Sequence, residues 1–193
     1  MRIIGGEKRG LRLAAVGAGD AAAHLRPTAD RVREAIFNLL VNGRHGNPIP
    51  GARVLDLFAG TGAFGLEALS RGATQATFVD DGAAACTLLR RNIELMRAAD
   101  ATEIRRCDAR KLGANPGAPF DLVFLDPPYG FGLGEQVMPA LLSGGWLAPG
   151  AMIVWEEATA PRLPVGLTLL DQRRYGAACV TLAHAPLAMA LQK

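Results

Sequence analysis

From residue 52 onward, short apolar runs alternate with stretches in which apolar residues recur at helical spacing. Helices are expected at 63–71, 83–99 and roughly 134–143, whereas 109–119 has the Gly, Asn and Pro content of a loop. The apolar runs between them are typical of buried strands: "ARVLDLF", "ATFVD", "TEIRRCD", "FDLVFLD" and "AMIVWEE". This alternation predicts an α/β domain with a mostly parallel sheet.

Two more β-like runs follow Pro164. They are "LTLLDQRRYG" and "CVTLAHA", and only the turn at Gly176 separates them. Because no crossover helix fits between them, they should pair antiparallel as a hairpin. The sequence therefore predicts a seven-stranded sheet that ends in an antiparallel hairpin.

Two different pieces precede the sheet. The segment "RIIGGEKRGLRL" predicts a small β-hairpin with glycine turns, and "RPTADRVREAIFNLL" predicts a helix capped near Thr28 and ended by Gly43. We therefore divide the chain into an N-terminal hairpin and basic helix at 1–43 and a core at 44–193.

The 193 residues, half of them hydrophobic, suffice for one substantial core. No apolar stretch is long enough to cross a bilayer and the N-terminus lacks a signal-peptide pattern, so we expect a cytoplasmic protein. The sequence leaves the oligomeric state open, and we expect a monomer. The three cysteines have no CxxC spacing and the three histidines are scattered, so the sequence indicates neither a disulfide framework nor a metal site.

Positive charge is concentrated at the N-terminal end. The net charge is +3, but residues 1–33 alone carry seven Lys or Arg against three acids. Solvated charges in an Arg- and Ala-rich chain would explain this, and so would a nucleic-acid surface. The candidate RNA-binding residues are Lys8, Arg9, Arg12, Arg26, Arg31 and Arg33.

Five strand candidates finish on or beside an acid. Turns favour Asp in general, but the ligand crevice of an open parallel sheet also lies beyond the carboxyl ends of its strands. Some of these acids should therefore surround one cleft. They are Asp56, Asp80, Asp108, Asp126 and Glu156.

A glycine loop follows the first strand. In "LDLFAGTGAFGLEALSRG", Gly60, Gly62 and Gly65 satisfy GxGxxG, and Asp80 stands twenty residues beyond Gly60, where an acid could bind a ribose. The pattern suits an NAD protein or any other ligand with a ribose. Asp56, inside an apolar strand, needs a cationic or hydrogen-bonding partner, which favours S-adenosylmethionine over a pyrophosphate.

The stretch "FDLVFLDPPY" ends the most apolar strand with an acid, two prolines and an aromatic residue. The prolines fix the backbone, so Asp126 and the Pro127 carbonyl could act as two rigid acceptors for an exocyclic NH₂ group. Pro128 keeps the segment rigid, and Tyr129 offers a flat surface on which a base can stack. These acceptors would aim the lone pair of an aromatic amine at a methyl donor.

The D-P-P-Y tetrapeptide resembles the motif of class I S-adenosylmethionine-dependent methyltransferases that act on exocyclic amines, including adenine-N6 and guanine-N2 enzymes. Five segments in order are similar to the RsmD family, which methylates N2 of a guanine in bacterial small-subunit (16S) ribosomal RNA. They are "RIIGGEKRGLRL", "LRPTADRVREAIFNLL", "LDLFAGTGAFGLEALSRGA", "FDLVFLDPPY" and "GWLAPGAMIVWEE". The resemblance covers residues 2 to about 183 and implies the Rossmann-like class I methyltransferase fold.

The resemblance also implies roles for individual positions. Asp126 to Tyr129 would hold the target base, and the basic N-terminus would contact ribosomal RNA or an assembling small subunit. The helix with Asp30 and Arg33 would border the cleft. The residues implied to bind S-adenosylmethionine are Asp56, Phe58, Ala59, Gly60, Thr61 and Gly62 for the methionine part, Asp80 for the ribose, Asp108 with Ala109 for the adenine region, and Asp126.

The sequence departs from the family pattern at two positions. Asp80 stands where family members more often have Glu, and Gly82 stands where a second acid is expected. Three alternatives remain at this point. They are a DNA or RNA adenine-N6 methyltransferase, an NAD-dependent oxidoreductase, and a non-catalytic RNA module that binds S-adenosylmethionine.

Overall fold

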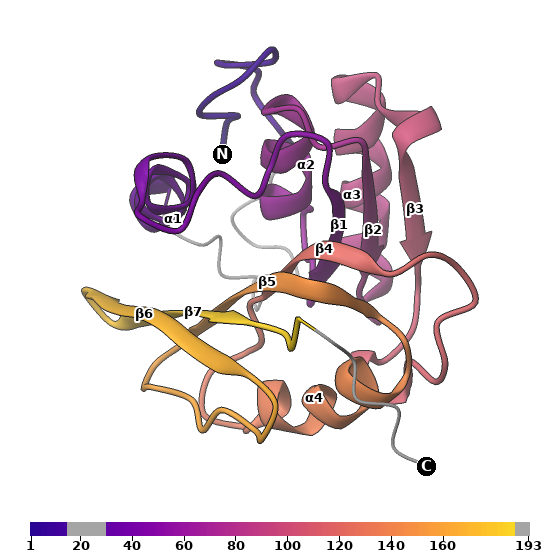
Figure 1. Cartoon of the computed structure of the whole chain (residues 1–193). Helices are drawn as coiled ribbons and strands as arrows, with labels where there is room; N and C mark the ends of the chain where they lie inside the picture. Colours follow the sequence, from indigo (N-terminus) through magenta and orange to yellow (C-terminus); the bar gives the residue numbers. More distant parts are fainter. Residues whose placement is uncertain (15–29, 188–193) are drawn as a thin grey trace.

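The computed structural model describes residues 1–14 and 30–187 (Figure 1). A seven-stranded sheet has the order β3-β2-β1-β4-β5-β7-β6, and β7 runs antiparallel to both of its neighbours. The strands are β1 Arg53–Leu57, β2 Gln75–Val79, β3 Thr102–Arg105, β4 Phe120–Leu125, β5 Leu147–Glu157, β6 Thr168–Tyr175 and β7 Ala178–His184. The helices are α1 Asp30–Asn42, α2 Ala63–Ser70, α3 Ala83–Met96 and α4 Leu133–Ser143, with single 3₁₀ turns η1 Ala99–Ala101 and η2 Ala109–Lys111.

Helices cover both faces of the sheet, because its strands are apolar on both sides. On one face α1, α2 and α3 pack over a core that includes Phe37, Phe64 and Phe124, whose rings are in mutual contact. On the other face α4 packs over Trp155 and its neighbours (Figure 1). Alternate residues of each strand serve the two cores, which confirms the predicted α/β architecture.

The predicted elements are confirmed with small shifts at their ends. The helix expected at 83–99 ends at Met96, because Arg97 takes the left-handed conformation with φ of 53°. The C-terminal hairpin is present, with Gly176 in its turn at φ of 63°. The expected cap at Thr28 lies outside the described residues.

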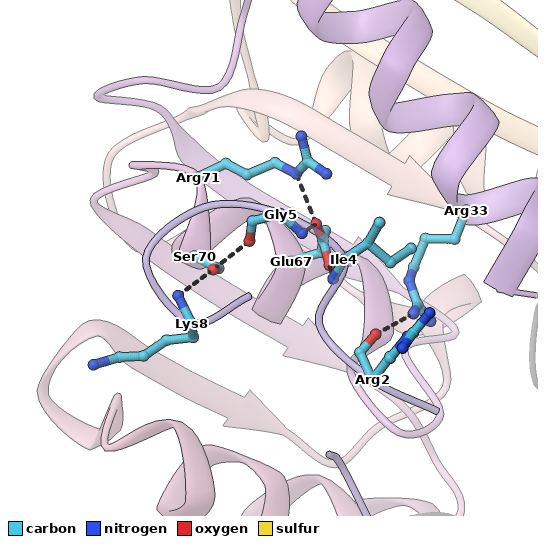
Figure 2. Close-up of polar contacts among 8 residues, drawn as sticks. All are labelled: Arg2, Ile4, Gly5, Lys8, Arg33, Glu67, Ser70 and Arg71. Atoms are coloured by element: carbon cyan, nitrogen blue, oxygen red, sulfur yellow. Dashed lines mark hydrogen bonds and ion pairs between the residues drawn. The ribbon is translucent and has the colours of Figure 1, made fainter. Parts of the chain in front are cut away.

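The N-terminal hairpin is held on α2 by one buried carboxylate. Glu67, which is fully buried, accepts the backbone N–H of Ile4 at 2.7 Å and of Gly5 at 2.8 Å, and it pairs with Arg71 at 2.7 Å (Figure 2). The Ser70 hydroxyl donates to the Gly5 carbonyl at 2.7 Å. Glu67 and Ser70 therefore tie the hairpin to α2. Within the hairpin, Arg2 and Arg12 form an isolated antiparallel bridge.

The hairpin approaches α2 so closely that side chains are excluded at its turn. A Cβ atom on Gly6 would lie 1.8 Å from the Ser70 carbonyl oxygen, and Gly6 has a φ of 75° that other residues rarely adopt. Ile3 and Leu13 are buried in the same core cluster as Ile36 of α1 and Val54 of β1. The hairpin, α1 and the sheet thus share one hydrophobic core.

Replacing Glu67 with Ala should reduce the free energy of unfolding by about 3–5 kcal/mol, because two backbone donors and the Arg71 guanidinium lose a buried acceptor. Chemical denaturation measures this change. The control is Glu94→Ala on the exposed side of α3, which should change stability by no more than about 0.5 kcal/mol. Equal stability of the two variants would show that the hairpin is held by other contacts.

Candidate active site at the carboxyl ends of the strands

The register of the parallel strands brings the ends of β1, β2 and β4 to one level, beside Trp155 of β5, which lies two residues before that strand ends. Leu57 pairs with Val79 on one side and with Leu125 on the other, and Leu125 pairs with Trp155. The next residue of each strand therefore begins the same edge of the sheet. These residues are Phe58, Asp80, Asp126 and Glu156.

The loop after β1 turns sharply before α2 begins. Phe58, Gly60 and Gly62 have positive φ values of 58°, 56° and 78°. For Phe58 this conformation costs about 1–3 kcal/mol, and such strain is found mostly at functional sites. The Ala59 N–H donates to the Val79 carbonyl at 3.1 Å, which anchors the loop on β2. The strained backbone at Phe58 marks this loop as part of a site.

Two of the three glycines in GxGxxG are required for packing. A Cβ on Gly62 would lie 2.4 Å from the Leu89 side chain, and a Cβ on Gly65 would lie 2.4 Å from the Phe78 ring. These two glycines therefore let α2 lie directly against β2 and α3. The loop backbone from Phe58 to Gly62 is the part of the motif that a ligand could contact.

Asp80 lies beside this loop, as its spacing from Gly60 predicts. Its two carboxylate oxygens accept the N–H groups of Gly60 and Gly82, each at 2.8 Å. Partial burial raises the pKa of Asp80, and these two hydrogen bonds oppose the increase. Gly82 thus supplies a backbone donor to Asp80, and a Cβ there would lie 3.0 Å from the carboxylate.

Asp56 obtains its partner from the protein itself. Its side chain is 1% exposed and accepts the Gly65 N–H at 2.9 Å, at the start of α2. Burial raises the pKa of Asp56 well above its ordinary range, and the nearby charges of Asp126 and Asp80 add to the increase. Asp80 and Asp126, which are both half-buried, place acidic groups at this edge of the sheet, which suits a cationic ligand.

Asp108 and Ala109 lie after the end of β3. Asp108 accepts the backbone N–H of Arg110 at 2.9 Å and pairs with its guanidinium at 2.7 Å. Hydrogen bonds from Arg110 lower the pKa of Asp108. Ala109 is buried in the core on the α4 side. Asp108 therefore holds the turn η2 in place, and Ala109 anchors it.

Two consecutive acids at the end of β5 hold the "DPPY" segment. The Tyr129 hydroxyl donates to Glu156 at 2.5 Å, and the Gly130 N–H donates to Glu157 at 3.2 Å. Pro127 is buried, Pro128 is exposed and Tyr129 is half-buried. Burial and the bond to Glu156 raise the pKa of Tyr129, and burial raises the pKa of Glu156. The segment is therefore fixed from β5 as well as by its prolines.

The candidate RNA-binding cations fall into separate groups. Arg9, Arg12 and Arg31 are exposed, and the Lys8 ammonium pairs with Glu7 at 2.9 Å. Arg26 lies outside the described residues.

The prediction that Arg33 contacts RNA is wrong for this structure. Its side chain is 1% exposed, and it donates to the Arg2 carbonyl at 2.5 Å and pairs with Asp30 at 3.0 Å (Figure 2). Burial lowers the pKa of Arg33. Arg33 joins α1 to the hairpin instead of facing solvent.

Three site-supporting residues were not predicted. They are Glu67 under the hairpin, Glu157 behind Gly130, and Asn92, which is fully buried and bonds to both Ala14 and the Thr61 carbonyl. Glu67 and Asn92 are polar residues on the apolar sides of their helices, which is the signal that could have identified them.

Within residues 1–14 and 30–187, no group of three or more His, Cys, Asp or Glu is placed to hold a metal ion. In the same part of the chain, no helix has the length and apolar character needed to span a membrane.

The strand order, the reversed β7, the glycine loop and the acid after β2 define the class I methyltransferase fold. The solved structure of the putative methyltransferase yhhF from Escherichia coli superposes with a TM-score of 0.82 at 37% identity. That match covers 97% of this chain and 99% of the other.

Residues 1–184 match the family model described as "Conserved hypothetical protein 95", and the chain belongs to this family, the RsmD family. "Ribosomal RNA small subunit methyltransferase D" of Escherichia coli K12 is 40% identical over 164 residues, which cover 85% of this chain and 78% of that protein. The protein of the same name from Haemophilus influenzae is 36% identical, and the match covers 91% of this chain and 89% of that protein. Membership of this methyltransferase family excludes the alternative that the protein is an NAD-dependent oxidoreductase.

The buried Asp56 carboxylate gives a prediction about stability. Because its pKa is raised in the folded state, its ionisation opposes folding, and this cost is absent at low pH, where the group is protonated. Asp56→Asn keeps an acceptor for the Gly65 N–H, so the unliganded variant should melt higher than the wild type at neutral pH. If the substitution removes a cost of about 1 kcal/mol from the free energy of folding, the Tm should rise by roughly 2–4 °C. Thermal melts should show this advantage shrinking as the pH falls toward 4; an advantage that grows would contradict it.

The hydrogen bond between Tyr129 and Glu156 gives a second prediction. Tyr129→Phe and Glu156→Ala each remove one partner, so their effects on the free energy of unfolding should not be additive. The coupling energy should be about 1–3 kcal/mol. Denaturation of both single variants and the double variant measures it. Strict additivity of the two stability changes would show that the bond contributes nothing. In an activity assay, Glu156→Gln retains an acceptor for the Tyr129 hydroxyl and should preserve more methyl-transfer activity than Glu156→Ala.

Proposed function

We propose that this protein transfers a methyl group from S-adenosylmethionine to the exocyclic N2 amine of a guanine in small-subunit (16S) ribosomal RNA. The observation that supports this most directly is the row of strand ends. It places Asp126 of the "DPPY" segment beside the glycine loop and level with Asp80. The proposed cofactor site and the proposed site for an aromatic amine would thereby be adjacent.

The residues around the loop fit S-adenosylmethionine. Asp80, fixed beside Gly60, would bind the ribose hydroxyls, and the backbone from Phe58 to Gly62 would hold the methionine part. The negative charge of Asp80 and Asp126 suits the amino group and sulfonium, whereas a pyrophosphate would be repelled. Asp108 and Ala109 would border the adenine. When bound, the cofactor supplies a methyl group made electrophilic by its sulfonium.

The protein's own contribution is positioning and charge stabilisation. Asp126 and the Pro127 carbonyl would accept the two N–H groups of the amine, so that its lone pair faces the methyl donor. Tyr129, oriented by Glu156, would stack on the base. As nitrogen becomes positive, the Asp126 carboxylate lowers the barrier electrostatically, and the methylated nitrogen then loses its surplus proton to solvent water.

Ribosomal RNA as the substrate is supported by the relatives named above and by the exposed cations at the N-terminus. Lys8, Arg9, Arg12 and Arg31 would contact phosphates, and Arg26 belongs to the same basic stretch. A stacked and paired guanine cannot reach the edge of the sheet, so the target should be a flipped or loop nucleotide.

The decisive experiment is transfer of labelled methyl from S-adenosylmethionine to small ribosomal subunits prepared without this enzyme, followed by nucleoside analysis. Label in N2-methylguanosine is expected. Label in N6-methyladenine would move the substrate to the adenine alternative, and absence of label would favour a non-catalytic module.

Asp126→Ala should reduce the rate of this transfer by about 10²–10³-fold, because the developing charge loses its stabiliser. The variant should still fold and bind the cofactor. Single-turnover rates, with cofactor affinity measured by calorimetry, separate the two effects. Full activity in this variant would show that the proposed role of Asp126 is wrong.

A further inference from the structure

A groove lies between α1 and the edge strand β6, outside the site described above. It has a volume of about 400 Å³. Figure 1 shows α1 and the β6–β7 hairpin at the same end of the molecule. The lining comes from one side of α1, at helical spacing, and from two residues of β6: Ala35, Asn38, Leu39, Asn42 and Gly43, with Arg173 and Tyr175.

The lining combines amides, a cation and an aromatic ring. Asn38 and Asn42 are exposed on α1. Arg173 is paired with Asp171 at 3.0 Å, which orients the guanidinium while leaving 52% of the side chain exposed. Tyr175 is half-buried against the core beside them. Such a set can bind phosphate, hydrogen-bond the edges of bases and stack on them.

A second cation stands at the far end of the groove. Arg44 follows the end of α1, is exposed, and donates to the Leu170 carbonyl of β6 at 3.4 Å. The lining of α1 from Ala35 to Gly43 is about 12 Å long at about 1.5 Å per residue. Three or four stacked nucleotides, at about 3.4 Å each, have this length.

The groove opens at the same edge of the sheet as the base site. Glu156 pairs with Val180, and Val180 pairs with Arg173. Two strand spacings of about 4.8 Å therefore separate Arg173 from Glu156, or about 10 Å. A strand whose guanine is held at Asp126 and Tyr129 would continue directly over Arg173.

We propose that this groove binds the single-stranded RNA that flanks the target guanine. This inference rests on the proposed function and adds a second contact between the protein and its RNA substrate. The hairpin docks on α2 through Ile4 and Gly5, while the groove lies between α1 and β6. The groove would therefore contact a part of the RNA that the hairpin does not.

Two variants from different elements test the groove. Asn38→Asp adds a negative charge on α1, and Arg173→Gln removes a cation from β6. The matched control is Arg174→Gln, which removes the same charge from the next residue of β6. Because successive strand residues face opposite sides of the sheet, Arg174 points away from the groove. Its guanidinium donates to the Ala158 carbonyl. The probes are small subunits that lack the methyl group and a single-stranded RNA oligonucleotide.

The double variant, which combines Asn38→Asp with Arg173→Gln, should raise the KM for small subunits roughly tenfold. Its kcat and its affinity for S-adenosylmethionine should be unchanged. Arg173→Gln should also lower the salt slope of oligonucleotide binding by about one. Arg174→Gln should resemble the wild type in both measurements. Equal effects of Arg173→Gln and Arg174→Gln, or no effect of either groove variant, would overturn the proposal.

The oligonucleotide measurement separates this inference from the proposed function. If the wild type transfers no methyl group to small subunits, the proposed function fails. Weaker oligonucleotide binding by the groove variants alone would then still support the groove, and equal binding by all variants would reject it.

Discussion

The parallel pairing of β1 with both β2 and β4 is the constraint on which the site depends. Because Leu57 is level with Val79 and Leu125, the chain leaves all three strands at the same height. A shift by one residue in either pairing would turn Asp80 or Asp126 to the opposite face of the sheet. The glycine loop, the acid after β2 and the "DPPY" segment are therefore functional neighbours only through this register.

Buried polar side chains extend this arrangement to segments distant in sequence. Asp56 joins β1 to the start of α2, Glu67 joins α2 to the hairpin, and Asn92 joins α3 to both Ala14 and the glycine loop. Each of them satisfies backbone groups that would otherwise be buried without partners. The hairpin, the glycine loop and the helices behind them are thus joined by buried hydrogen bonds.

Much of the fold could be predicted from the sequence, because strand and helix periodicity and the glycine turns are local signals. Asp80 could be placed beside Gly60 for the same reason, since both lie within one β-α-β unit. Arg33 could not be placed, because its burial depends on the Arg2 carbonyl, thirty-one residues away. The groove of Asn38 and Arg173 was likewise invisible, because α1 and β6 meet only after the whole sheet is assembled.

The position of β6 at the edge of the sheet has a consequence for solubility. An edge strand leaves backbone N–H and C=O groups unpaired, and another chain can add to them. In β6 the register shifts between Leu169 and Asp171, and exposed arginines follow at Arg173 and Arg174. Both features discourage pairing with a second molecule. The arginines of this strand therefore protect the protein from edge-to-edge aggregation whether or not RNA is present.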